Sequence, residues 1–176
     1  MLTQIVSERF PRVKLWRRTL AFLIDFLVIW MIGGLFAAIL PILPFFILFL
    51  AFWLAYRVVL VSRNHGQSLG RYALDVTLVD SRFNSVPQLL ILSKREGILG
   101  LAAALAAIGL NAISLNPAGI LLVIPLVVDC GFAWTEDSRR AFHDRVAKTL
   151  VVGSRRGYSL DLKVKRLVAE LTRNMK

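Results

Sequence analysis

The chain has 176 residues, of which 57% are hydrophobic, and its formal net charge is +11. Soluble domains contain about 45–50% apolar residues, so this composition is typical of a membrane protein. The basic residues border the apolar runs and form no patch interleaved with aromatic residues, which argues against nucleic acid as a partner. We expect the partner to be a lipid bilayer, whose anionic cytoplasmic leaflet attracts the positive charge.

Four apolar stretches approach the roughly 20 residues that a transmembrane helix needs. They run from Leu20 to about Leu40, from about Pro41 to Val61, from about Gly97 to Leu115 and from about Ala118 to Trp134. No small-residue cleavage site follows the first stretch, so we expect it to be a retained span and not a signal peptide.

The connections between these stretches predict the topology. LPILPF joins the first pair and SLNPAG the second, and both are uncharged and rich in turn residues. Segments 1–18, 57–96 and 135–176 hold nearly all the charges. Because cytoplasmic segments keep Lys and Arg, we predict an all-α protein with four transmembrane helices in two hairpins. It would be a multi-pass protein of the cell membrane, with both termini cytoplasmic (N-in/C-in).

Short amphipathic segments are expected on the cytoplasmic side. Apolar and polar residues alternate over 74–79 and predict a short strand, and QLLILSKREG (88–97) predicts an interfacial helix that leads into the third span. TLVVG, which begins at Thr149, indicates a second extended piece. We divide the chain into a four-helix membrane domain, residues 1–152, and a basic tail, residues 153–176, whose apolar face over 160–171 predicts an amphipathic helix.

Asp25 lies inside the first apolar stretch, where a carboxylate costs about 2.5–3.5 kcal/mol on insertion scales. Arg18 is seven residues earlier, two turns away on the same helix face, so Asp25 needs a partner on another helix. Asp129 lies at a similar depth, shortly before Trp134. Two facing carboxylates would share a proton or hold a cation, as a proton- or sodium-coupled site requires. Alternatively, each Asp bonds a neighbouring helix separately and acts as a structural lock.

A second polar cluster, DSRRAFHDRVAKT, covers residues 137–149. His143 and Asp144 are adjacent and do not face each other on a helix, and no nucleophile motif accompanies them. We expect a helix start there, with Asp144 reaching back to a base at a span mouth such as Arg18. The glycines of GQSLGR (66–71) favour a turn with close backbone approach or positive φ, not a phosphate loop. The single cysteine, Cys130, forms no intrachain disulfide and no structural zinc site. Because the sequence also has no metal-ligand set, no nucleophile with a base and no phosphate loop, we expect no metal, no cofactor and no enzymatic activity.

Three motifs in order, RTLAFLID, GQSLGR and FHDRVAKTLVV, resemble those of the RDD family of bacterial integral membrane proteins, from about Arg17 to Val152. The family is named for one Arg and two Asp. The resemblance implies that these are Arg18, Asp25 and Asp144, with Asp129 an extra acid of this sequence. The family pattern usually has a small residue at the position of Lys148. The resemblance also implies transport of small ligands, with cation/proton antiport suggested for some members.

Two functional hypotheses follow. In the first, the protein is a small-ligand or monovalent cation/proton transporter, in which Asp25 titrates, Asp129 or Asp144 assists and Arg18 resets the site. A chain with four spans would then need a homo-oligomer to enclose a path. In the second, it is a non-transporting membrane scaffold or accessory subunit whose cytoplasmic loops bind a partner. The polar site predicted under either hypothesis comprises Arg18, Asp25, Asp129, His143 and Asp144.

Overall fold

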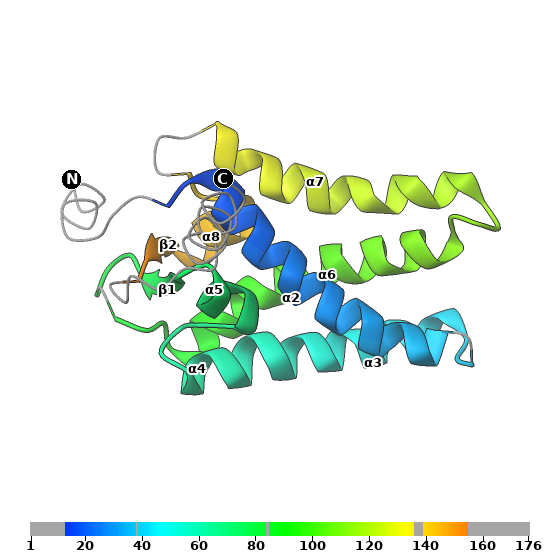
Figure 1. Cartoon of the computed structure of the whole chain (residues 1–176), viewed down its shortest axis with the longest axis horizontal. Coiled ribbons are helices and arrows are strands. Elements are labelled where there is room, and N and C mark those ends of the chain that lie inside the picture. The colour runs from blue at the N-terminus through cyan, green and yellow to red at the C-terminus, as the bar shows by residue number, and fades with distance from the viewer. Residues whose placement is uncertain (1–12, 38, 84, 136–138, 155–176) are drawn as a thin grey trace, which may run out of the picture.

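A computed structural model describes residues 13–37, 39–83, 85–135 and 139–154. Four long helical segments lie alongside one another (Figure 1), and each overlaps most of one of the four predicted apolar stretches. The segments are α2 (Leu15–Ala37); α3 (Ile42–Leu54) continued by the π-helix η1 (Ala55–Leu60) and by α4 (Val61–Arg63); α6 (Leu89–Ala112); and the 3-10 helix η2 (Pro117–Val123) continued by α7 (Ile124–Gly131) and η3 (Phe132–Trp134).

Three of these segments are long and apolar enough to cross a membrane, namely Leu15–Ala37, Ile42–Arg63 and Pro117–Trp134. The helix α6 differs because Lys94, Arg95 and Glu96 lie in its N-terminal half, so its apolar part is shorter. The structure therefore supports a mostly helical protein with membrane-spanning helices, while the count of four spans stays a prediction.

The core lies where α2 and α3 pack on α6. Phe26, Phe49 and Trp53 are buried there, and the rings of Phe49 and Trp53 stack with their centroids 6.0 Å apart. The facing side of α6 is built of small residues. A Cβ at Gly100 would lie 2.7 Å from Cδ1 of Trp53, so glycine is what lets the indole approach the helix backbone.

Two short strands and two short helices cover one end of the bundle (Figure 1). They are α5 (Leu69–Ala73), β1 (Val76–Asp80), α8 (Phe142–Ala147) and β2 (Thr149–Gly153). The strands pair antiparallel, from Val76 opposite Gly153 to Asp80 opposite Thr149. Both predicted extended segments are confirmed, and their pairing joins the two charged segments that follow the second and fourth apolar stretches. The two uncharged connections lie at the opposite end (Figure 1).

One element differs from the sequence-based expectation, and one residue explains a departure from the family pattern. The helix predicted over 88–97 is not a separate element but the start of α6, and Arg95 and Glu96 on it are buried. Lys148 ends α8 with φ of 53°, a left-handed conformation that favours glycine, which accounts for the small residue usual at this position. The helix predicted over 160–171 lies outside the described residues.

The contact between α6 and η2 gives a test of the packing. A Cβ at Gly109 would lie 2.3 Å from the carbonyl oxygen of Gly119, so Gly109→Ala must push the two segments apart. We expect a loss of about 1–3 kcal/mol in the free energy of unfolding, measured by SDS titration of the purified protein in mixed micelles. Gly34→Ala is the matched control, since a Cβ there meets nothing within 4 Å; equal losses in both variants would contradict the packing.

Candidate functional site

Asp25 is fully buried and accepts four hydrogen bonds from elements that follow α2 in the chain. The hydroxyl of Tyr56 and the backbone N–H of Gly70 each lie 2.8 Å from Oδ1. The hydroxyl of Ser68 lies 2.5 Å from Oδ2, which also accepts from Nη1 of Arg57. Because every neighbour donates and one of them is a cation, the geometry favours the ionised carboxylate as the partner of Arg57.

The π-helix η1 brings two consecutive residues, Tyr56 and Arg57, to the same carboxylate. Adjacent residues of an α-helix do not face the same neighbour. A π-helical turn is wider than an α-helical turn. Such turns are rare in proteins, and many of those that occur lie at functional sites. The unusual local geometry therefore has a direct consequence, which is that both side chains reach Asp25.

GQSLGR supplies the other two donors to Asp25. Ser68 caps α5 by accepting from the N–H of Arg71, and the next turn presses against α2. A Cβ at Gly70 would lie 2.0 Å from the carbonyl oxygen of Ala21, so only glycine fits. Gly66 has φ of 81°. Both features confirm the prediction that these glycines serve close approach and positive φ.

Glu96 is the centre of the buried charge network. One of its oxygens accepts from Nη2 of Arg71 at 3.2 Å and from Nη1 of Arg95, and the other accepts from Nε of Arg57 at 3.0 Å. Arg57 thereby bridges Glu96 to Asp25. All of these side chains are buried, so the charges are neutralised mainly by one another and not by water.

Asp144 connects the network to α2. It accepts from Nε of Arg95 at 2.9 Å, from Nη2 of Arg18 and from the N–H of Ala141 at 3.2 Å. The predicted reach of Asp144 to Arg18 is confirmed. Burial raises the pKa of Asp144, but the charges of Arg18, His143 and Arg95 outweigh burial and hold that pKa well below its usual range.

His143 lies between two carboxylates. Asp129 accepts from the backbone N–H of His143 at 2.9 Å and contacts Nδ1 of its ring. The other ring nitrogen, Nε2, lies 3.0 Å from Nη2 of Arg95 and 3.3 Å from Oδ1 of Asp144. Since a guanidinium only donates, neutral His143 accepts at Nε2 and donates from Nδ1 to Asp129. A protonated ring would donate to both acids.

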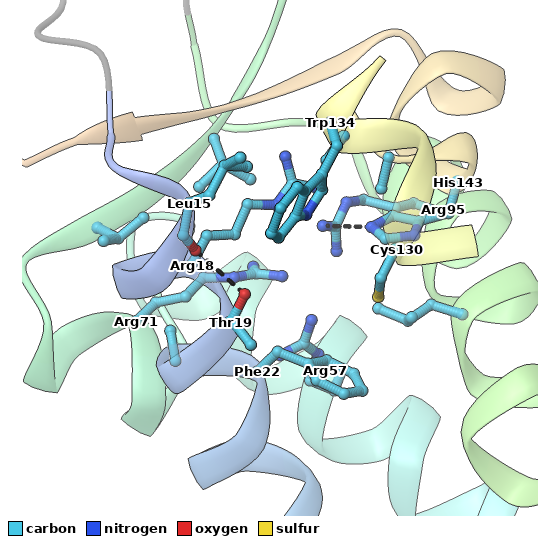
Figure 2. Close-up of a pocket in the computed structure, with 16 residues that line it drawn as sticks. Leu15, Arg18, Thr19, Phe22, Arg57, Arg71, Arg95, Cys130, Trp134 and His143 are labelled. Carbon is cyan, nitrogen blue, oxygen red and sulfur yellow. Dashed lines mark hydrogen bonds between the residues drawn. The ribbon is translucent and has the colours of Figure 1, made fainter. Parts of the chain in front are cut away.

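A cavity of about 90 Å³ lies beside this network (Figure 2). Its charged lining is entirely basic and consists of Arg18, Arg57, Arg71 and Arg95, joined by His143. The remaining lining is mostly apolar and includes Phe22 on α2, Leu99 on α6 and Trp134 on η3. None of the network's carboxylates is among the lining residues. In the described part of the chain, no group of three or more His, Cys, Asp or Glu side chains is arranged to hold a metal ion.

The structure brings the five predicted residues into one region but not into the predicted pair. Asp25 bonds to donors from η1 and α5, whereas Asp129 bonds to His143 on α8, so the two carboxylates have separate partners. Sequence analysis missed four members of the network, namely Arg57, Arg71, Arg95 and Glu96. A signal for Arg57 was present, because it lies within the second apolar stretch, where an Arg needs an acid as much as Asp25 needs a base.

The apolar helices and this buried network define the protein as a membrane protein with a charged site at one end of its bundle. The family model described as the RDD family matches residues 12–148, and the chain belongs to that family. No curated protein and no solved structure matches the chain. The matched range contains every charged residue of the network.

Asp25→Asn tests whether the ion pair with Arg57 is a major support of the fold. The amide removes the negative charge and leaves a buried guanidinium partly uncompensated, so we expect the free energy of unfolding to fall by about 3–5 kcal/mol. SDS titration in mixed micelles measures the change. Lys94→Gln is the control, since it removes an exposed charge that has no contact with Asp25 and should leave stability unchanged. If Asp25→Asn were equally neutral, Asp25 would not anchor the network.

The lowered pKa of Asp144 predicts how its contribution to stability depends on pH. A depressed pKa means that the contribution of Asp144 to stability is complete above the usual aspartate range and is lost only as the pH falls through the lower folded-state value. The difference in melting temperature between wild type and Asp144→Asn should therefore stay constant between about pH 7 and pH 9. A difference that grows steadily over that range would show that Asp144 still ionises there.

Proposed function

We propose that the four long helical segments all cross the cell membrane, as two hairpins, with the charge network and both termini on the cytoplasmic side. Three segments are long and apolar enough to span, and α6 runs beside them (Figure 1). The arginines of the network bond to one another's acids at the end that holds α5 and α8. The two uncharged connections lie at the other end (Figure 1). The positive-inside rule orients such a molecule with the basic end in the cytoplasm.

Within that topology we propose a proton-linked transporter of a small ligand. The observation that carries the proposal is the position of His143, which bridges Asp129 on α7 and Asp144 on α8 beside a cavity between the helices. Histidine is the side chain that most readily gains and loses a proton near neutral pH. Asp25 is saturated with donors, so in this proposal it anchors the helices, and His143 handles the proton.

The groups that face His143 make its protonation matter to the ligand. Three charged groups contact the ring: Asp129 at Nδ1, and Asp144 and Arg95 from α6 at Nε2. Arg95 also lines the cavity. A proton on His143 would remove the acceptor that Arg95 uses and direct the ring N–H to Asp144. The charge and hydrogen bonding of the cavity wall therefore change with the proton.

A transport path needs more protein than one chain provides. In the segment Pro117–Trp134, only 11% of the residues are buried inside the chain. This segment therefore presents apolar surface outward. We propose that a second copy of the chain packs there and that a homo-oligomer encloses the path.

The alternative function is a membrane scaffold without transport. The observation that favours it is the saturation of Asp25, whose four donors lie 31 to 45 residues further along the chain. Such contacts lock helices whether or not anything moves between them. Under this alternative the paired strands at the network end would bind a protein partner.

Reconstituted vesicles separate the two functions. Purified protein is placed in liposomes with an internal pH-sensitive dye, and gradients of K⁺, Na⁺ and inorganic phosphate are imposed in turn. A transporter should give a proton flux with at least one of them, and His143→Gln should slow that flux by about a hundredfold, because it removes a positioned proton carrier. His65→Gln changes an exposed histidine outside the network and should keep the wild-type rate. No flux with any gradient, or an unchanged His143→Gln, would reject the transporter.

A further inference from the structure

We propose that the cavity beside the charge network is a binding site for a tetrahedral oxyanion, of the kind presented by inorganic phosphate, sulfate or the phosphate of a lipid headgroup. The proposed site deepens the proposed function by naming the class of ligand. Transport of the anion rests on the proposed function, whereas binding of the anion does not.

The first support is the charge of the lining. Side chains of Arg18, Arg57, Arg71 and Arg95 converge on the same space from α2, η1, α5 and α6 (Figure 2). Since no carboxylate lines the cavity, a cation placed there would meet four guanidinium groups and be repelled. Guanidinium groups are the preferred protein partners of phosphate-like anions, because their fork of donors matches the oxyanion geometry.

The second support is a free hydrogen-bond donor. Arg71 is 4% exposed, and its Nη2 donates to Glu96. Its Nη1 is buried and has no hydrogen-bond partner among the described residues. A buried donor left unpaired is costly, by about 1–3 kcal/mol and more for a charged group, and Arg71 lines the cavity. An anion in the cavity would satisfy this donor.

The third support is the electrostatic state of Arg71 itself. Burial lowers the pKa of Arg71 to about 9, helped by the positive charges of Arg57 and Arg95, although Glu96 and Asp25 oppose the shift. The charged form of Arg71 is therefore incompletely stabilised by its present neighbours. An anion bound beside it would stabilise that charge.

The size and walls of the cavity restrict the ligand. A volume of about 90 Å³ admits a compact group and not a large organic molecule. Leu99 and Phe22 form apolar wall beside the guanidinium groups, which excludes water and strengthens each charged hydrogen bond. Trp134, which is 80% exposed, stands at the rim.

Binding is tested first on the full-length wild-type protein, delipidated in detergent at constant ionic strength. Phosphate and sulfate should raise the melting temperature and bind by titration calorimetry, whereas sodium and chloride should not. Arg71→Gln should weaken phosphate binding by about tenfold or more, because a charge-assisted donor is lost. Arg82→Gln removes an exposed charge away from the cavity and should bind like wild type. Arg71→Lys keeps the charge but loses the fork and should fall between the two.

A second arm identifies the source of the anion. The same protein is placed in nanodiscs of zwitterionic lipid alone or with phosphatidylglycerol. If phosphatidylglycerol protects the wild type but not Arg71→Gln and displaces phosphate, the occupant is a lipid headgroup; if phosphate binds equally in both discs, it is a free anion. Both results support the site. An absence of any effect of phosphate, sulfate or phosphatidylglycerol on the wild type would overturn it. Anion binding without ion flux in vesicles would reject transport and leave the site standing.

Discussion

The structure depends on one constraint, which is that buried carboxylates must be neutralised by guanidinium groups from other parts of the fold. Asp25 on α2 takes Arg57 from η1, Glu96 on α6 takes Arg57 and Arg71, and Asp144 takes Arg18 from α2. In surroundings with little water, removing one partner leaves a charge that nothing nearby compensates. The helices are therefore held in register by electrostatics as well as by packing, and the short elements at the network end are required to complete the set.

In the proposed function, this network would also link the proton to the ligand. The four carboxylates and four guanidinium groups balance when His143 is neutral, so a proton on the ring adds one positive charge beside the cavity. We expect that charge to favour an anion, and by thermodynamic reciprocity a bound anion favours the proton. This coupling would let one gradient drive the other. The acids of the network do not prevent the proposed anion from binding, because they bind the arginines and do not line the cavity.

The extent to which the sequence predicted this arrangement differs from one feature to the next. The four helical segments follow from apolar runs and uncharged turns, because helix length and hydrophobicity are local properties. The need of Asp25 for a partner on another helix follows from the cost of a charge in hydrocarbon, and the reach of Asp144 to Arg18 follows from charge alone. The sequence does not predict which residue pairs with Asp25. That depends on the π-helix at Ala55–Leu60, which brings Tyr56 and Arg57 to Asp25, and no hydrophobic periodicity in the sequence indicates a π-helix. Arg95 and Glu96 look like ordinary interfacial charges until the fold buries them.

The central claim is that Asp25 is an ionised anchor held by Arg57 and not a proton carrier. An infrared difference spectrum between wild type and Asp25→Asn, recorded near neutral pH in membranes, tests this most directly. The account predicts that the variant loses carboxylate stretching bands and nothing in the carbonyl region of a protonated acid. A protonated-acid band that is present in the wild type and lost in the variant would contradict it.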